Sequence, residues 1–288
     1  MAPNSRLRNK YIEPAPRALA LGGVEPHTPL MRIPPDDQLL YKVMTVENLL
    51  QSLINNYLHF NRVDSYLDFT NADENDGRQL PRDQALNAAV KFQSAPDFSV
   101  ADYYDQCRAR TYACCFSTEK SSYIWENYAN GSEKGKVCVV FQFGKLRAML
   151  NSVMNPDDAI LLYEGNPCLQ IFSLNYGLIN YVPWETHRTN GDYLSNPILY
   201  TYIKDSDRFR EERELRISLS AIGIGHFALK DGSVIEFPTS LQLGFDFRNA
   251  IACGVIQEIS LAPDTEQNFL IHELSKLRIE PTLTANKK

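Results

Sequence analysis

The sequence predicts an α+β fold in which one or more mixed, largely antiparallel sheets are flanked by helices. Apolar residues recur at helical spacing mainly in the first half of the chain, whereas period-two segments typical of strands dominate the second half. The pair Asp231-Gly232 separates two short apolar runs, which favours a hairpin between antiparallel strands. With 288 residues, 44% of them hydrophobic, the chain can bury a substantial core.

The N-terminal region is expected to form an extended arm over residues 1–36. Seven of the sixteen prolines fall within the first 35 residues, and proline interrupts both helices and central strands. The arm is a candidate docking segment for a partner. We expect a single α+β domain of the catalytic type over residues 37–280 and a polar tail over residues 281–288.

Ordered structure is expected to begin with a strand at Gln38–Met44, and Thr45 is placed to cap the helix that follows. The helix is indicated by apolar residues at helical spacing, namely Val46, Leu49, Leu50, Leu53, Ile54 and Tyr57. A second strand is expected at Leu58–Phe60. Turn-forming residues throughout Asn71–Arg82 predict a long surface loop.

The central and C-terminal elements follow from the same two periodicities. The uninterrupted small and apolar residues of Thr111–Ser117 predict a buried strand, and a helix carrying Tyr123, Trp125 and Tyr128 is expected after it. Further strands are expected at 136–143, near residues 161 and 179, in a hairpin over 227–237 and at 254–261. Further helices are expected at 83–92, 145–150 and 265–277.

Composition excludes several classes of protein. A net charge of -6 and a pI near 5.5 argue against a broad basic surface for nucleic acid. The six cysteines have no CxxC pair and no zinc-type spacing to the five histidines, so no metal site is predicted. No apolar stretch approaches the roughly 20 residues that span a bilayer. We therefore expect a cytoplasmic protein with reduced thiols and no membrane partner.

The segment Glu212–Leu219 is expected to be a strand with one apolar and one polar face. Its apolar residues alternate with the polar set Glu212, Glu214, Arg216 and Ser218. Two acids beside an arginine on one strand face indicate either a functional site or a surface with cross-paired charges.

The chain has no P-loop, GxGxxG, GxSxG or HExxH motif. The spacing Lys204-x4-Phe209-x2-Glu212-x-Glu214-x-Arg216 instead resembles the hallmark of DUF2971, a bacterial family of unknown function. Three further blocks agree in order: Leu40-Tyr41-Lys42; Cys115-Phe116-Ser117 with Trp125-x2-Tyr128-Ala129 and Gly135-x2-Cys138-Val139-Val140-Phe141; and Asn180-Tyr181-Val182. The chain departs from the family where Phe209 replaces tryptophan and where Tyr66-Leu67-Asp68-Phe69 replaces Asn-Asp-Pro.

A more remote resemblance is to ADP-ribosyltransferases of the arginine, serine, glutamate type. These enzymes carry a basic residue on the first strand, then an aromatic-x-Ser-Thr-Ser strand, then an E-x-E. The chain is similar in part, because it has Tyr41-Lys42 or Arg62, then Phe116-Ser117-Thr118, then Glu212-Arg213-Glu214. The resemblance implies an ADP-ribosyltransferase-like fold and NAD as the substrate that donates ADP-ribose.

The resemblance also implies roles for these residues. Glu214 would be the catalytic carboxylate, because an oxocarbenium-like transition state needs a negative charge beside it, and Glu212 would orient or deprotonate the acceptor. A cation near Tyr41, at Lys42 or Arg62, would neutralise the phosphates of NAD. Ser117 and Thr118 would shape the nicotinamide pocket, with Phe116, Trp125 or Tyr128 as its aromatic wall.

Three functions remain open from the sequence. The first is an NAD-dependent ADP-ribosyltransferase of the toxin or phage-defence kind. Its acceptor is left open between a protein side chain, a nucleic-acid base and a small molecule, and an antitoxin is a candidate partner. The second is a metal-dependent nuclease in which Asp68, Glu212 and Glu214 bind a divalent cation. The third is a non-catalytic interaction module in which the acids and arginines form a structural network.

Overall fold

The computed structural model describes most of the chain between Met31 and Ala285. The described residues are 31–68, 73–153, 161–168, 172–189, 194, 197–221 and 227–285. The predicted N-terminal arm therefore lies largely outside the described residues. At its end, Met31 packs against Ile179 and Tyr202, and the carbonyl of Arg32 accepts a hydrogen bond from the Leu178 amide.

Eleven strands form one large sheet that branches at β5, and the strands come from both halves of the chain. The order is β17, β16, β6, β1, β5, β2, β15, β7 and β8, while β12 and then β9 continue from β5 on its other edge. The strands are β1 Leu39–Thr45, β2 Tyr57–Arg62, β5 Thr111–Ser117, β6 Lys136–Gln142, β7 Leu161–Tyr163, β8 Asn166–Pro167, β9 Phe172–Leu178, β12 Glu214–Ala221, β15 Ser240–Gly244, β16 Ile256–Leu261 and β17 Leu283–Ala285.

Among the described residues, the strand pairs of this sheet are antiparallel except for β16 and β17. Three two-stranded sheets accompany it: β3 Lys91–Phe92 with β4 Ala95–Ser99, β10 Asn180–Val182 with β11 Ile203–Asp205, and β13 Phe227–Ala228 with β14 Val234–Ile235. The expected α+β class with a mixed, largely antiparallel sheet is confirmed.

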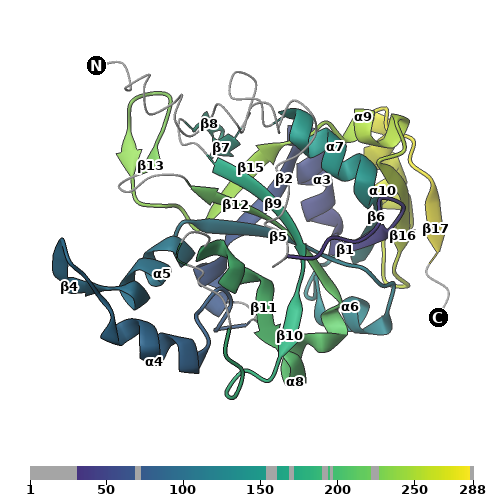
Figure 1. Cartoon of the computed structure of the whole chain (residues 1–288). Coiled ribbons are helices and arrows are strands. Elements are labelled where there is room, and N and C mark those ends of the chain that lie inside the picture. The colour runs from purple at the N-terminus through teal and green to yellow at the C-terminus, as the bar shows by residue number, and fades with distance from the viewer. Residues whose placement is uncertain are drawn as a thin grey trace.

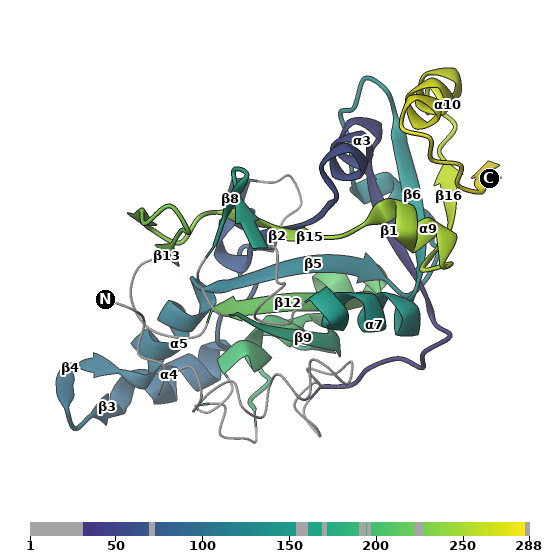
Figure 2. The ribbon, with the colours of Figure 1, turned by 90° about the horizontal axis from the view of Figure 1, so that it is seen from above.

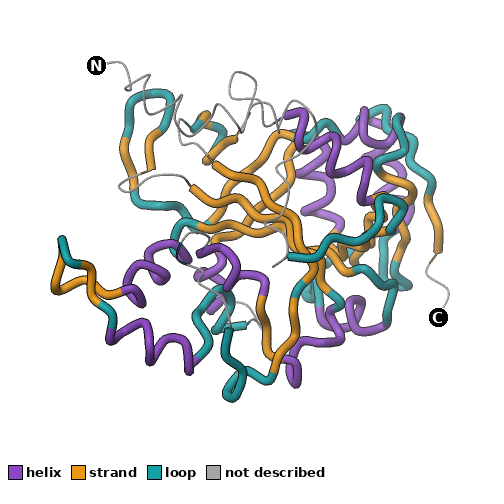
Figure 3. Tube along the Cα trace, in the orientation of Figure 1, coloured by secondary structure: helices purple, strands orange, loops and turns teal. Residues whose placement is uncertain are grey.

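Six of the described helices lie in two groups at opposite ends of the molecule (Figures 1 and 3). One group is α3 Val46–Asn55, α7 Phe143–Val153, α9 Phe247–Ala252 and α10 Gln267–Lys276, and the other is α4 Pro81–Ala89 with α5 Val100–Arg108. A 90° rotation shows α4, α5 and the β3–β4 hairpin projecting away from the sheet (Figure 2). Short helical turns complete the fold: α6 Ser122–Asn127, α8 Ser206–Phe209, η1 Val63–Asp68, η2 Pro197–Tyr202 and η3 Arg210–Glu212.

The principal core lies where the helices of the first group pack on the sheet. In α3, the buried residues Val46, Leu49, Leu50 and Leu53 form one stripe, as their helical spacing predicts. The Thr45 hydroxyl accepts a hydrogen bond from the Asn48 amide at 3.1 Å, which confirms Thr45 as the N-cap. No described helix is long and apolar enough to cross a membrane.

The two edges of β5 are used differently, and this places the candidate site. One edge pairs with β12 along the whole strand, from Glu214 opposite Ser117 to Ser220 opposite Thr111. The other edge is shared, because β1 meets it only at Ser117 and β2 only at Ala113 and Tyr112. The sheet therefore divides at this edge of β5.

Two segments differ from the expectation. The loop expected on the surface over 71–82 is partly internal, because Asp73, Asp76 and Gln79 are buried. The residues expected as a polar tail include β17, which pairs in parallel with β16. Neither difference is visible in local composition, since both depend on partners distant in sequence.

Candidate active site

Glu212 and Glu214 do not share a strand face as the alternation predicted. Glu212 ends η3, Arg213 adopts a left-handed conformation with φ 47°, and β12 begins only at Glu214. The turn at Arg213 breaks the period-two pattern. It nevertheless leaves both carboxylates buried, with side chains 9% and 4% exposed.

Lys204 joins the two carboxylates. Its Nζ lies 2.7 Å from Glu212 Oε2 and 2.8 Å from Glu214 Oε2, and its side chain is only 7% exposed. The same ammonium lies over the ring of Phe209, 5.2 Å from the centroid. Lys204 comes from β11 and Phe209 from α8, so two short elements outside the large sheet position this part of the site.

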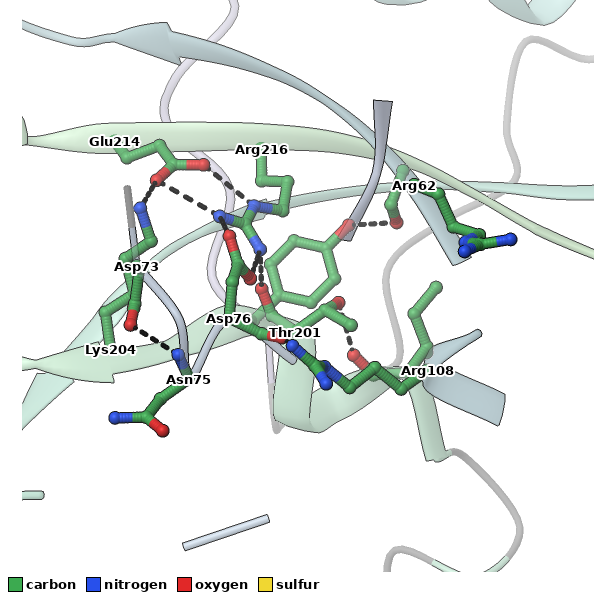
Figure 4. A network of polar contacts seen from close by, with 12 residues as sticks. Arg62, Asp73, Asn75, Asp76, Arg108, Thr201, Lys204, Glu214 and Arg216 are labelled. Carbon is green, nitrogen blue, oxygen red and sulfur yellow. Dashed lines mark hydrogen bonds and ion pairs between the residues drawn. The ribbon is translucent and has the colours of Figure 1, made fainter. Parts of the chain in front are cut away.

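Arg216 continues the network on the opposite side of Glu214 (Figure 4). Its guanidinium donates to both Glu214 oxygens at 2.8 and 3.3 Å and to both Asp76 oxygens at 2.5 and 2.9 Å. The remaining N–H donates to the Thr201 carbonyl at 2.6 Å. All five donors of this fully buried guanidinium are engaged, so Arg216 orients its neighbours and has no donor left for a ligand.

The spacing of the DUF2971-like motif now has a physical explanation. Lys204, Phe209, Glu212, Glu214 and Arg216 form one connected cluster, in which each member contacts another. Asp76 completes this cluster, although the sequence predicts only a surface loop at its position. The Asp-Gly turn signal at 76–77 was visible, but it predicts only a turn, and no local pattern predicts that its carboxylate is buried.

Gly77 allows the loop to bring Asp76 into the core. It has φ +71°, a left-handed conformation that side chains disfavour. A Cβ at this position would lie 3.0 Å from Val63 Cγ2, 3.2 Å from Thr201 Cγ2 and 3.3 Å from Arg108 Cγ. The loop is therefore both conformationally restricted and closely packed where it delivers the carboxylate.

Replacing Gly77 with alanine is expected to lower the free energy of unfolding by about 1–2 kcal/mol, the cost of a left-handed alanine, with an added penalty from crowding. Gly131→Ala is the matched control, because Gly131 has φ +84° with no atom within 4 Å of an added Cβ. Urea unfolding of both variants should show the larger loss for Gly77→Ala. Equal losses would contradict the close packing of this loop.

The environments of the two glutamates push their pKa values in opposite directions. Burial raises the pKa of Glu212 above its ordinary value, against the opposing charge of Lys204 and with a contribution from Glu214. Burial would also raise the pKa of Glu214, but the positive charges of Arg216 and Lys204 overcome this effect and hold it below its ordinary value. Such separation is typical of carboxyl pairs that divide a charge-stabilising role from a proton-transfer role.

Tyr41, Ser117 and Glu214 lie side by side on three neighbouring strands. Ser117 is opposite Tyr41 of β1 and opposite Glu214 of β12 in the antiparallel register. Directly opposed residues point to the same face of a sheet with Cα atoms roughly 5 Å apart. The ADP-ribosyltransferase-like set has three blocks. Tyr41 from the first, Ser117 from the second and Glu214 from the third thus meet at one end of β5.

The basic residues of the predicted set lie elsewhere. Lys42 follows Tyr41 on the strand and so points to the opposite face, where its Nζ donates to the Cys115 carbonyl and lies 5.1 Å from the centroid of the buried Phe116 ring. Arg62 is opposite Tyr112, toward the other end of β5, and pairs with Asp64 at 2.5 Å. Strand alternation therefore separates Lys42 and Phe116 from Ser117 and Glu214.

Tyr128 contacts the acidic cluster directly. Its hydroxyl donates to Glu212 Oε1 at 2.5 Å, and the residue as a whole is 39% exposed. Tyr128 was expected within the helix, but it is the C-cap of α6 and has an extended conformation. Of the three candidates for the aromatic wall, Tyr128 is the one whose side chain contacts Glu212 in the described structure.

The hydroxyls beside Glu214 are held by local backbone bonds. Ser117 Oγ donates to the Glu119 carbonyl at 2.9 Å and accepts from its amide, and Thr118 Oγ1 donates to the Arg213 carbonyl at 2.9 Å. Near the start and end of α6, Ser121 Oγ and Trp125 Nε1 are buried and have no hydrogen-bond partner among the described residues. Asp73 Oδ2, in the polar network of Figure 4, is also buried without a partner in the described structure, so a bound ligand could still satisfy any of these three atoms.

No three metal-ligating side chains are grouped in the described part of the chain. The position between Glu212 and Glu214 that a cation would take is occupied by the ammonium of Lys204. Asp68 ends η1, and its side chain lies outside the described residues.

Two cavities lie near α4 and α5, and neither is lined by Lys204, Glu212, Glu214 or Arg216. The first, of about 290 Å³, includes Asp83, Arg188 and Tyr200 in its lining. The second, of about 380 Å³, lies between the 73–80 loop and α5.

Comparison with known proteins gives little further guidance. No protein-family model matches the chain, DUF2971 included, and no curated protein matches it. Two solved structures of DarT from Thermus sp. 2.9 align with it: one in complex with ADP-ribosylated ssDNA (11% identity, TM-score 0.33, 89% of this chain and 98% of that chain) and one in complex with carba-NAD+ (9% identity, TM-score 0.32, 88% and 98%). TM-scores this low assign neither a fold nor an activity.

Proposed function

We propose that this protein transfers ADP-ribose from NAD to a macromolecule, with Glu214 and Glu212 as the catalytic carboxylates. The observation that carries the proposal is the register that sets Ser117 between Tyr41 and Glu214 on neighbouring strands. Residues from the beginning, middle and end of the predicted set thereby border one end of β5, where the sheet divides.

The two pKa directions support distinct chemical roles. Glu214 stays ionised near neutral pH and would stabilise the positive charge that develops at C1′ of the nicotinamide ribose. The C1′–N bond breaks, and nicotinamide leaves with the electron pair. The acceptor nucleophile then bonds to C1′, and Glu212, whose pKa is raised, takes its proton.

The remaining contacts to NAD fall to residues that border the cluster. Tyr128 supplies the aromatic wall for nicotinamide, because the residue is partly exposed and its side chain contacts Glu212. Arg213, rather than Lys42 or Arg62, takes the phosphate-binding role. Its side chain is 44% exposed, and its carbonyl is bonded to Thr118.

The acceptor is proposed to be a protein or a nucleic acid. A bacterial toxin or phage-defence effector, with an antitoxin as partner, is the biological setting that the motif resemblance suggests. The proposal is tested by incubating the protein with NAD labelled in the ADP-ribose part and a cell extract. Label in macromolecules supports it, and digestion with protease or nuclease identifies the acceptor. No label transfer under any condition would contradict it.

Replacing Tyr128 with phenylalanine is expected to shift the acid side of the pH–activity profile to higher pH. The hydroxyl stabilises ionised Glu212, so its loss raises the pKa of that carboxyl further, and a general base is active only when ionised. The profile of label transfer against pH checks this. Tyr123→Phe is the control, because Tyr123 lies near Glu212 without a hydrogen bond to it in the described structure; equal shifts in both variants would contradict the role of Tyr128.

One observation favours a second function, a non-catalytic module with a structural ion network. Glu214 is 4% exposed, and Arg216 and Lys204 already occupy both of its oxygens. Buried networks of this kind can exist without chemistry. Two results together would favour this second function: the wild type releases no nicotinamide from NAD, and the Glu214→Gln variant is less stable than the wild type.

A further inference from the structure

The second cavity, of about 380 Å³, has two arginines in its lining. It is lined by Asp64, Arg78, Gln79, Gln84, Asp105 and Arg108. Among the described residues, neither Arg78 nor Arg108 has a carboxylate within ion-pair distance, although both border the cavity. This differs from the acidic cluster, where the described cations are fully paired.

Arg108 is fixed in place by backbone carbonyls. Its Nε donates to the Asp76 carbonyl at 2.6 Å, and Nη2 donates to the Glu74 carbonyl at 3.3 Å. Arg78 follows the same turn, and its side chain is exposed. Burial and the nearby positive charge of Arg78 lower the pKa of Arg108, and they outweigh the opposing effect of the Asp64, Asp76 and Asp105 carboxylates, so the two guanidinium groups repel each other. A bound anion would relieve this repulsion.

The two acids of the lining equal the two arginines in number, but in the described structure neither acid is within ion-pair distance of Arg78 or Arg108. Asp64 is paired with Arg62 at 2.5 Å and is therefore already neutralised. Asp105 lies near both Arg108 and Arg78, yet burial raises its pKa above its ordinary value. Apart from the two bonds of Arg108 to backbone carbonyls, the N–H donors of Arg78 and Arg108 have no hydrogen-bond partner among the described residues.

We propose that this cavity binds a phosphate group through Arg78 and Arg108, and that occupation holds the loop which carries Asp76. Guanidinium groups match the oxygens of phosphate in geometry and charge. Arg108 bonds to the carbonyl of Asp76, and the carboxylate of the same residue bonds to Arg216 (Figure 4). A phosphate on Arg108 therefore acts on the residue that orients Arg216 and, through it, Glu214.

The test is calorimetric titration at low salt and pH 7 with two probes, inorganic pyrophosphate and a short single-stranded oligonucleotide, both without NAD. Wild-type binding should weaken roughly ten- to a hundredfold in Arg78→Ala, as for the loss of a charge-assisted hydrogen bond. Asp105→Asn should tighten binding, because it removes a negative charge from the lining. Hydrogen exchange in the 73–80 loop should slow when the probe is bound.

Arg248→Ala is the matched control, because Arg248 is an exposed arginine of α9, in the helix group at the opposite end of the molecule (Figure 1). It should leave binding unchanged. If pyrophosphate binds more tightly than the oligonucleotide, the ligand is a terminal phosphate. If the oligonucleotide binds more tightly, the ligand is a phosphodiester. The proposal is overturned if neither probe binds, or if Arg78→Ala and Asp105→Asn bind both probes as the wild type does. Because NAD is absent, either outcome is independent of transfer activity.

Discussion

Replacing Asp76 with alanine is expected to lower the free energy of unfolding by about 3–5 kcal/mol, a large part of the stability of an ordinary domain. Asp76 is 2% exposed and accepts two hydrogen bonds from Arg216, whose side chain is fully buried. Without this carboxylate, Lys204, Glu212 and Glu214 remain in the cluster, but the guanidinium of Arg216 loses one of the two carboxylates that accept its hydrogen bonds through both oxygens. Urea unfolding at pH 7, compared with the wild type, measures the loss.

Two further variants make this prediction specific. Glu74→Gln, two residues earlier in the same loop, changes an exposed side chain 3.9 Å from Arg208 and should stay within about 0.5 kcal/mol of the wild type. The double variant Asp76→Ala with Arg216→Met should recover part of the loss, because it also removes the uncompensated charge. A single Asp76→Ala variant as stable as Glu74→Gln would show that the buried pair does not stabilise the fold.

Much of the fold could be predicted from local patterns. The strand Thr111–Ser117, the N-cap at Thr45 and the buried stripe of α3 were all predicted, because each depends on residues close together in sequence. The branching of the sheet at β5 was not predicted. It depends on which strands reach each edge, and strand periodicity carries no information about partners.

The candidate site was predicted in part for the same reason. The pattern from Lys204 to Arg216 has its members within thirteen residues, and their contacts follow from that closeness. Asp76 is 140 residues away from Arg216, and its bond to Arg216 is a long-range contact. Lys42 was expected beside Ser117, but alternation along β1 turns it to the other face and brings Tyr41 there instead.

The variant Glu214→Gln is expected to lower the rate of transfer roughly 10²- to 10⁴-fold, because glutamine has the shape of glutamate but cannot stabilise a positive charge at C1′. Glu212→Gln should lower transfer to the acceptor but retain more nicotinamide release, since its proposed role concerns the acceptor proton. Glu273→Gln, in an exposed pair on α10, is the matched control and should behave as the wild type.

A structural role alone would give a different pattern. Loss of the Glu214 charge leaves Arg216 bonded to Asp76 and Lys204 bonded to Glu212, so the variant should remain folded. Unfolding curves for the three variants separate loss of activity from loss of structure. Activity that falls only in proportion to the unfolded fraction would favour the non-catalytic module.

The most direct measurement is the release of nicotinamide from NAD by the wild type and by Glu214→Gln, each shown to be folded at the assay temperature. The proposed function predicts release by the wild type and a loss of at least about a hundredfold in the variant. Equal release by the two folded proteins, or none by the wild type with its acceptor present, would contradict the assignment of Glu214 as the catalytic carboxylate.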